Sequence, residues 1–335
     1  MTSVVIDFGT SSFKYGVAGD RFPKKLQCSS FGDPWNGEDI IDWVNFKKLI
    51  NKIFENLCLD PKECKVLVCL PVHQPYELDC KLADYFFNLL KIQAIYFCLQ
   101  PVLSCYSFGR LSGAVMEIGH SMLQMCIIEN GFSISDSISC DRLGAVLPME
   151  YLQKEYKKKG VDLNLTQAQQ LLKEHCHVSS DIELESRNVT PVQVYGYQQT
   201  IALGQEKFLA YETLFNNSLL GSNYKTIVEI FQSCLGTIQQ SQWPKFLSNI
   251  IISGGLSHAI GITERIRLEL IKAYPQNSIN VIKSSQTKRI NEDNSFIGAS
   301  ILGSLVQFKE KWVVREKFLE IGNKAINICY RVDKN

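Results

Sequence analysis

Hydrophobic and polar positions alternate most clearly in residues 4–17, where an apolar run is interrupted by one acid and a turn of small residues. The run ends at Asp7, the turn is Gly9-Thr10-Ser11, and the apolar pattern returns after Lys14. This pattern predicts a β-hairpin with a polar tip. Such a tip lets backbone N–H groups approach an anion, with Lys14 adding a charge and Asp7 reaching a metal-bound water. Turns of this composition also close many ordinary hairpins.

The same pattern returns in residues 113–128, again as an apolar strand, an acid, a short turn and an apolar strand. Glu117 takes the place of Asp7, Gly119 that of Gly9, and Ser121 that of Ser11. Internal repetition of this kind indicates two similar halves. We therefore expect each half to present a hairpin to a shared cleft.

Between and after the hairpins, segments of helical spacing alternate with short apolar runs. This alternation predicts an α/β fold with parallel strands. The expected strands are 64–70, 94–99, 131–139, 195–198, 200–203 and 249–252. The expected helices are 42–57, 78–90, 100–109, 147–158, 166–174 with Thr166 as its cap, 223–239, 263–273 and 295–309.

Composition narrows the class of protein. The chain has 335 residues, enough for two domains, and a formal net charge of +1, which gives no field favouring nucleic acid or an anionic membrane. No apolar run is long enough to span a bilayer, and no basic and apolar leader precedes the first strand. Twelve scattered cysteines fit reduced, buried thiols. The cluster His175-Cys176-His177 lacks a second pair nearby that would complete a zinc site.

Several stretches are familiar in combination: the two acid-tipped hairpins, residues 94–110, residues 201–215, the turn 252–255 with 261–265, and 296–302. Together they resemble the actin and actin-related protein family, within the actin, Hsp70 and sugar-kinase fold. The similarity runs along nearly the whole chain. It implies an α/β actin-like fold with two ribonuclease-H-like halves around a nucleotide cleft.

The resemblance also implies site residues, with ATP or ADP and Mg as the cofactors, although a nucleotide-free protein remains an alternative. The first phosphate loop takes Asp7, Gly9, Thr10, Ser11 and Lys14, with Asp7 holding the metal through water. The second takes Glu117, Gly119, His120 and Ser121. Lys173 and Glu174 match a pair that contacts the nucleoside, Gly254 and Gly255 match the adenine-side glycines, and Gln100 matches a glutamine that orders the attacking water.

Departures from the family pattern concentrate in the second loop. The family normally reads Asp-Ser-Gly-Asp-Gly there, whereas this chain has Glu117-Ile118-Gly119-His120-Ser121. Ser11 replaces a glycine of the first loop, and Gln124 replaces the water-positioning histidine. Phosphoryl transfer depends on a placed metal and an oriented water. These changes should remove hydrolysis before they remove binding, so we expect no efficient ATPase.

A deletion is the second departure. The family inserts a small subdomain between positions that correspond to Asp20 and Trp43, and the span here is too short to fold one. The implied division is subdomain 1 in 1–28, 38–107 and 294–335, a remnant of subdomain 2 in 29–37, subdomain 3 in 108–143 and 222–293, and subdomain 4 in 144–221.

Loss of this subdomain removes one of the two different faces that a head-to-tail filament needs. The cleft that receives the neighbour's loop keeps apolar residues, namely Tyr106, Phe108, Gly109, Leu302, Leu305 and Phe308. Each of them could equally be an ordinary core residue. Taken together they predict a protein that docks on the pointed end of an actin-like filament.

The expected function is therefore a non-polymerising cap or fixed subunit of a cytoplasmic, cytoskeletal assembly. This resembles the pointed-end actin-related subunit of dynactin. The expected partners are actin or actin-related filament subunits and other complex subunits, with no direct nucleic-acid contact. Two alternatives stay open: an actin-related subunit of a nuclear chromatin-remodelling complex, and an ATPase or kinase of the wider fold.

Overall fold

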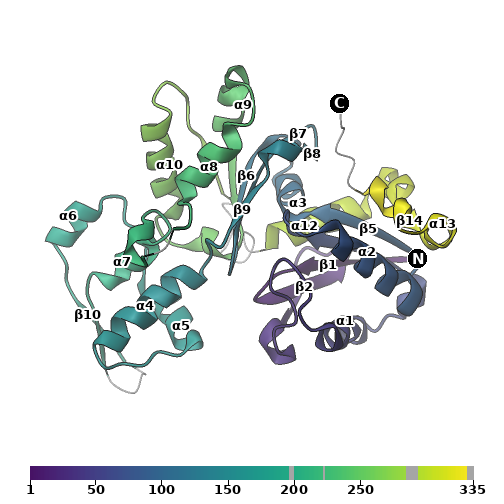
Figure 1. The fold of residues 1–335 in the computed structure, drawn as a ribbon, viewed down its shortest axis with the longest axis horizontal. Helices are drawn as coiled ribbons and strands as arrows, with labels where there is room; N and C mark the ends of the chain where they lie inside the picture. Colours follow the sequence, from purple (N-terminus) through teal and green to yellow (C-terminus); the bar gives the residue numbers. More distant parts are fainter. Residues whose placement is uncertain (196–199, 222, 284–292, 330–335) are drawn as a thin grey trace.

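Two halves, each built on one β-sheet, lie side by side in the computed structural model (Figure 1). The structure describes residues 1–195, 200–221, 223–283 and 293–329. The first half contains the N-terminal strands and the last helices of the chain, and the second contains the middle. Among the described residues, no helix is both long and apolar enough to cross a membrane.

The sheet of the first half has the order β14-β5-β4-β1-β2-β3. The central strand β1 pairs antiparallel with β2 and parallel with β4, and β4 pairs parallel with β5. Because both faces of β1 and β4 are covered, their residues form a nearly continuous buried run. The strands are β1 Thr2–Phe8, β2 Ser12–Val17, β3 Lys24–Gln27, β4 Cys64–Leu70, β5 Ala94–Leu99 and β14 Val313–Val314.

The second sheet repeats this plan with the order β13-β12-β6-β7-β8, and β9 also pairs with β7. Its central strand β6 pairs antiparallel with β7 and parallel with β12, as β1 does with β2 and β4. This shared order confirms the predicted two-half α/β fold. The strands are β6 Gly113–Ile118, β7 Leu123–Glu129, β8 Phe132–Ser133, β9 Ser139–Asp141, β12 Ile250–Ser253 and β13 Val281–Ile282.

Helices of the first half cover its sheet. The helix α1 (Trp43–Leu57) begins as expected, because the Asp42 side chain accepts hydrogen bonds from the Val44 and Asn45 amides. Its apolar positions, among them Phe46, are buried at helical spacing. The others are α2 Tyr76–Asp84, the π-turn η3 Tyr85–Leu89, α3 Gln100–Ser107, α12 Asn294–Ser304, the 3₁₀ segments η9 Val306–Lys311 and η10 Gly322–Ile328, and α13 Arg315–Ile321.

The second half carries a helical insertion between β9 and β12 (Figure 1). A buried ion pair fixes part of it, because Arg265 contacts Glu212 through two hydrogen bonds of 2.8 and 3.0 Å. The elements of the insertion are α4 Val146–Lys158, α5 Leu165–His175, α6 Ile182–Arg187, β10 Val192–Val194, β11 Ile201–Leu203, α7 Glu206–Glu212, α8 Ile227–Leu235 and α9 Trp243–Leu247. The helix that carries Arg265, α10 Ile262–Ala273, follows β12.

Several predicted helices needed correction. Asn164, not Thr166, caps α5, because its side chain and that of Gln167 form a reciprocal capping box. The predicted helix 223–239 is shorter, since the capping box of Thr226 starts α8 and Gly236 ends it. The predicted helix 295–309 ends at Ser304 and continues as 3₁₀ turns. The helix predicted over 78–90 breaks into α2 and a π-turn.

The strand predicted over 200–203 is observed as β11 (Ile201–Leu203), but its antiparallel partner β10 is Val192–Val194, which precedes the predicted strand 195–198. Residues 196–199 lie outside the described residues. The strand predicted over 131–139 is divided by a 3₁₀ turn, Ser135–Ser137, into β8 and β9.

Residues 28–42 form a single strap rather than a folded subdomain. The strap contains one 3₁₀ turn, Cys28–Phe31, and an isolated bridge between Trp35 and Ile40. Trp35 is 1% exposed and packs edge-on against Phe8, with ring centroids 5.7 Å apart. The strap therefore lies on the core of the first half, and α1 follows directly.

Candidate functional site

The two predicted hairpins exist, and their acids sit in matching places. Asp7 is opposite Lys14 in the β1–β2 ladder, and Glu117 is opposite Gln124 in the β6–β7 ladder. Both acids are buried, because they precede the strand ends by one residue and face the junction of the halves. The strand pairing thus places Asp7 and Glu117 at equivalent positions of the two hairpins, as the sequence repeat predicts.

Asp7 is held by groups of its own half. The Lys14 ammonium lies 3.3 Å from Asp7 Oδ2, and Gln100 Nε2 donates to Asp7 Oδ1 at 2.8 Å. Burial on its own lowers the pKa of Lys14, but the attraction of Asp7, Asp293 and Glu117 outweighs it and raises that pKa. Lys14 is therefore a charged partner of the carboxylates around it.

Gln100 and Gln124, at the places where the family orders a water, bond to each other. Gln124 Nε2 donates to Gln100 Oε1 at 2.8 Å, and the Val72 amide donates to Gln124 Oε1 at 2.7 Å. Gln100 also donates to the Phe8 carbonyl at 2.9 Å. Both amide groups are thereby fixed by the protein itself.

Glu117 has a different environment from Asp7. Its Oε1 accepts hydroxyl groups of Ser104, Ser253 and Ser295 at 2.8, 3.2 and 2.8 Å. Its Oε2 is buried without a hydrogen-bond partner among the described residues. Burial raises the pKa of Glu117, and the charge of Asp7 adds to this, while the serine hydrogen bonds and Lys14 oppose it.

The tips of the two hairpins touch each other. Ser121 Oγ donates to Thr10 Oγ1 across the junction at 2.8 Å. Gly9 and Gly119 lie in the two turns, and the Gly119 amide closes its turn on the Met122 carbonyl at 2.8 Å. The Ser11 carbonyl accepts the Cys28 amide at 3.0 Å, which ties the first tip to the strap.

The glycines predicted on the adenine side have different surroundings. Gly254 has a φ of +87°, and a Cβ there would lie 2.4 Å from the Ile118 carbonyl oxygen, so β6 itself requires the glycine. A Cβ at Gly255 would meet nothing within 4 Å. Gly254 therefore has a structural reason to be glycine, whereas Gly255 is exposed and has none.

Lys173 and Glu174 lie on the exposed side of the last turn of α5, whose buried side is Ala168, Leu171 and Leu172. Glu174 accepts from Gln170 on the same helix at 3.3 Å. Within the described residues, no hydrogen bond joins this pair to either hairpin tip. The nucleoside contact that the resemblance implies for this pair stays a prediction.

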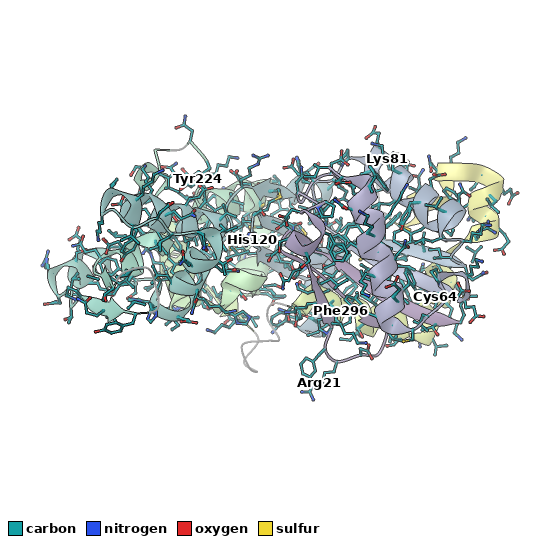
Figure 2. The ribbon with its side chains drawn as sticks, turned by 90° about the horizontal axis from the view of Figure 1, so that it is seen from below. Arg21, Cys64, Lys81, His120, Tyr224 and Phe296 are labelled. Carbon is teal, nitrogen blue, oxygen red and sulfur yellow. The ribbon has the colours of Figure 1, made fainter. Side chains whose placement is uncertain are left out.

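The histidines have local partners. His120 lies in the second tip near the junction of the halves (Figure 2); burial lowers its pKa, and Asp33 of the strap opposes that change. In the cluster 175–177, His177 contacts Glu185 at 2.5 Å and Cys176 is buried. No group of three potential metal-ligating side chains occurs among the residues that the structure describes.

The residues of the predicted partner cleft gather at the ends of α3 and α12. Phe308 is buried in the cluster that joins the halves, and Tyr106, Phe108 and Leu302 pack against that cluster. Gly109 has a φ of +66° and open space beside it. Leu305 is 46% exposed.

Further apolar side chains that follow α3 and α12 in the chain, not singled out in the sequence, are also exposed: Leu111 at 63%, Phe132 at 53% and Val306 at 68%. The Tyr106 hydroxyl donates to the Gly131 carbonyl at 2.7 Å, and the Gly131 amide donates to the Leu111 carbonyl at 2.6 Å. These contacts bring β8 next to the end of α3. We call Leu111, Phe132, Leu305 and Val306 the apolar edge.

The fold and the paired hairpins define the class of protein, and comparison with known proteins agrees. The actin family model matches residues 33–330, and the chain belongs to the actin family. It is 28% identical to centractin of Schizosaccharomyces pombe over 361 residues, covering 94% of each chain. It is 28% identical to actin-like protein 7B of Homo sapiens (97% of this chain, 87% of that protein) and 25% identical to actin-related protein 2 of Acanthamoeba castellanii (96% and 88%).

Proposed function

We propose that this protein is a non-polymerising actin-related protein that caps the pointed end of an actin-like filament or serves as its fixed end subunit. The observation that carries the proposal is the strap. Residues 28–42 pack on the first half and form no projecting subdomain. Head-to-tail assembly needs two different complementary faces on each subunit. A chain lacking one of them can join an existing end but offers no place for the next subunit.

The apolar edge supplies the remaining face. Leu305 and Val306 directly follow α12 and are exposed, and Leu111 and Phe132 are exposed beside the end of α3. Clustered exposed apolar side chains mark interaction surfaces more often than scattered ones do. In this proposal, the apolar edge binds the apolar loop that the last subunit of an actin-like filament presents at its pointed end. The predicted cleft residues Tyr106, Phe108 and Phe308 support it from below.

Weak or absent ATP hydrolysis belongs to the same proposal. Hydrolysis needs a water oriented by free polar groups. Gln100 and Gln124 stand at the corresponding places and use their amides on each other, on Asp7 and on Val72. The protein is then a structural subunit rather than an enzyme.

The relatives give the proposal its setting. Actin-like protein 7B and actin-related protein 2 are named for their relation to actin. We propose actin or actin-related filament subunits as the partners, a cytoplasmic cytoskeletal location, and a dynactin-like assembly as the host.

Assembly and partner capture test this function together. The purified protein, centrifuged at high speed in polymerising buffer, is expected to stay in the supernatant; filaments formed by the protein alone would contradict the proposal. Affinity purification from native cells is expected to recover actin-like filament subunits in stoichiometric amounts. Recovery of a chromatin-remodelling ATPase in their place would overturn it.

The matched variants are Leu305→Asp with Val306→Asp on the apolar edge and Leu184→Asp as the control. Leu184 is an equally exposed leucine on α6 of the other half. Filament subunits should be lost from the edge variant and retained by the control. Equal recovery with both variants would show that the apolar edge is not the docking face.

A further inference from the structure

The two phosphate loops of the family are joined directly to each other in this chain. The Ser121 and Thr10 hydroxyl oxygens are 2.8 Å apart, and each comes from a different half. Two groups that both hydrogen-bond a phosphate oxygen between them stand roughly 4.5–5.5 Å apart, given ordinary O–H···O lengths. The Thr10–Ser121 hydrogen bond leaves no such space between these two groups.

The strap closes the same place from outside. At Gly37, whose φ is +102°, a Cβ would lie 2.9 Å from Met122 Sδ and 3.0 Å from Thr10 Cγ2. The backbone of the strap therefore touches both tips at once. Trp35 anchors it in the core on one side, and the Asn36 side chain accepts the Glu38 and Asp39 amides at 2.9 and 2.8 Å. We call Thr10, Gly37, Ser121 and Met122 the tip clasp.

The segment around the tip clasp is negatively charged, whereas a polyphosphate, itself an anion, needs positive charge. The strap carries Asp33, Glu38, Asp39 and Asp42 and no lysine or arginine. Lys14 faces Asp7, Asp293 and Glu117, and Lys25 pairs with Asp293 at 2.9 Å. Both lysines thus have carboxylate partners within the fold, and further negative charge at this place would be repelled.

The phosphate-loop residues therefore do not fit a nucleotide with Mg. We propose that the tip clasp takes the place of the nucleotide phosphates and holds the two halves together, so that the folded protein is independent of ATP. In this account the cleft is closed permanently by the chain itself.

Nucleotide content and thermal stability test the proposal without any activity assay. One sample of protein purified from cells is denatured with acid, and the nucleotide that it releases is measured by chromatography. A second sample is treated with EDTA to remove any bound metal and nucleotide, and its Tm is recorded with and without 1 mM Mg·ATP. We expect no stoichiometric nucleotide and a Tm change below about 1 °C. Bound nucleotide at one per chain, or a rise of roughly 5 °C or more with Mg·ATP, would overturn the proposal.

A double-mutant cycle tests the clasp itself. Thr10→Ala and Ser121→Ala should each lower the Tm of the EDTA-treated protein. Because each substitution removes the same hydrogen bond, the double variant should lower the Tm by little more than either single variant does. The controls are Ser248→Ala and Thr237→Ala, whose hydroxyls bond carbonyls three residues earlier in their own segments. Additive losses at Thr10 and Ser121 would show that the two tips are not coupled.

Discussion

The two halves share one strand order but differ in the segment that follows β3 in the first half and β9 in the second. In the first half the insertion is the strap of residues 28–42, held by the packing of Trp35 on Phe8. In the second half it is a set of helices and a hairpin, anchored by the buried pair of Arg265 and Glu212. The comparison teaches that the repeated sheet keeps its strand order both around a short strap and around a set of helices.

The largest effect should follow from breaking the anchor of the second insertion. Arg265 donates to Glu212 and to the Ser179 carbonyl, and Glu269 contacts its Nε. Arg265→Ala leaves Glu212 buried without its cation and should lower the free energy of unfolding by about 3–5 kcal/mol. Denaturant unfolding measures this change. The control Arg267→Ala, which removes an exposed pair with Glu264, should leave the free energy of unfolding nearly unchanged, because solvent screens that pair.

The strap should be the next most sensitive region. Trp35→Leu removes a fully buried indole from the first core and should cost about 2–4 kcal/mol. Because Trp35 also anchors the segment over the hairpin tips, limited proteolysis should cut residues 28–42 faster in this variant. A loss of stability below about 1 kcal/mol, with an unchanged cleavage pattern, would mean that the strap is not integral to the first core.

A smaller effect distinguishes the two hairpin acids. The pKa of Glu117 is raised from its ordinary value of 4.5, first by burial and then by Asp7. The folded state therefore holds this proton more tightly than the unfolded state, and Glu117 favours folding at low pH and opposes it once ionised. Glu117→Gln should give a higher Tm than the natural protein at pH 8, by on the order of 2 °C.

That difference should shrink as the pH falls, because more of Glu117 is then protonated in the natural protein as well. Asp7→Asn is the comparison variant. It removes the carboxylate that is hydrogen-bonded to Lys14 and should lower the Tm at pH 8. If both variants raised the Tm at pH 8, or if neither did, the proposed difference between Asp7 and Glu117 would be wrong.

Much of the fold could be predicted from local patterns. The alternation around Asp7 and Glu117 gave both hairpins and the repeat, because strand period and turn composition are properties of neighbouring residues. The strands 64–70 and 94–99 are observed with the predicted bounds. The helix ends went wrong where capping decided them, at Asn164 and Thr226.

The candidate site was less predictable, because its contacts join distant elements. The serines around Glu117 come from α3, β12 and α12, and a serine in any one of these segments carries no signal of its own. The Thr10–Ser121 contact and the position of Gly37 between the tips depend on how the halves meet. The only sequence signal was that Ser121 stands where the family has a glycine.

The most direct test of the central claim is the growth of an actin-like filament at its pointed end. Filaments with blocked barbed ends are mixed with excess subunits, and elongation is followed with increasing amounts of this protein. The account predicts that growth stops at substoichiometric amounts relative to the free subunits. It also predicts that Leu305→Asp with Val306→Asp abolishes this effect while Leu184→Asp does not. Undiminished growth at saturating protein, or incorporation of the protein along the filament, would contradict the claim.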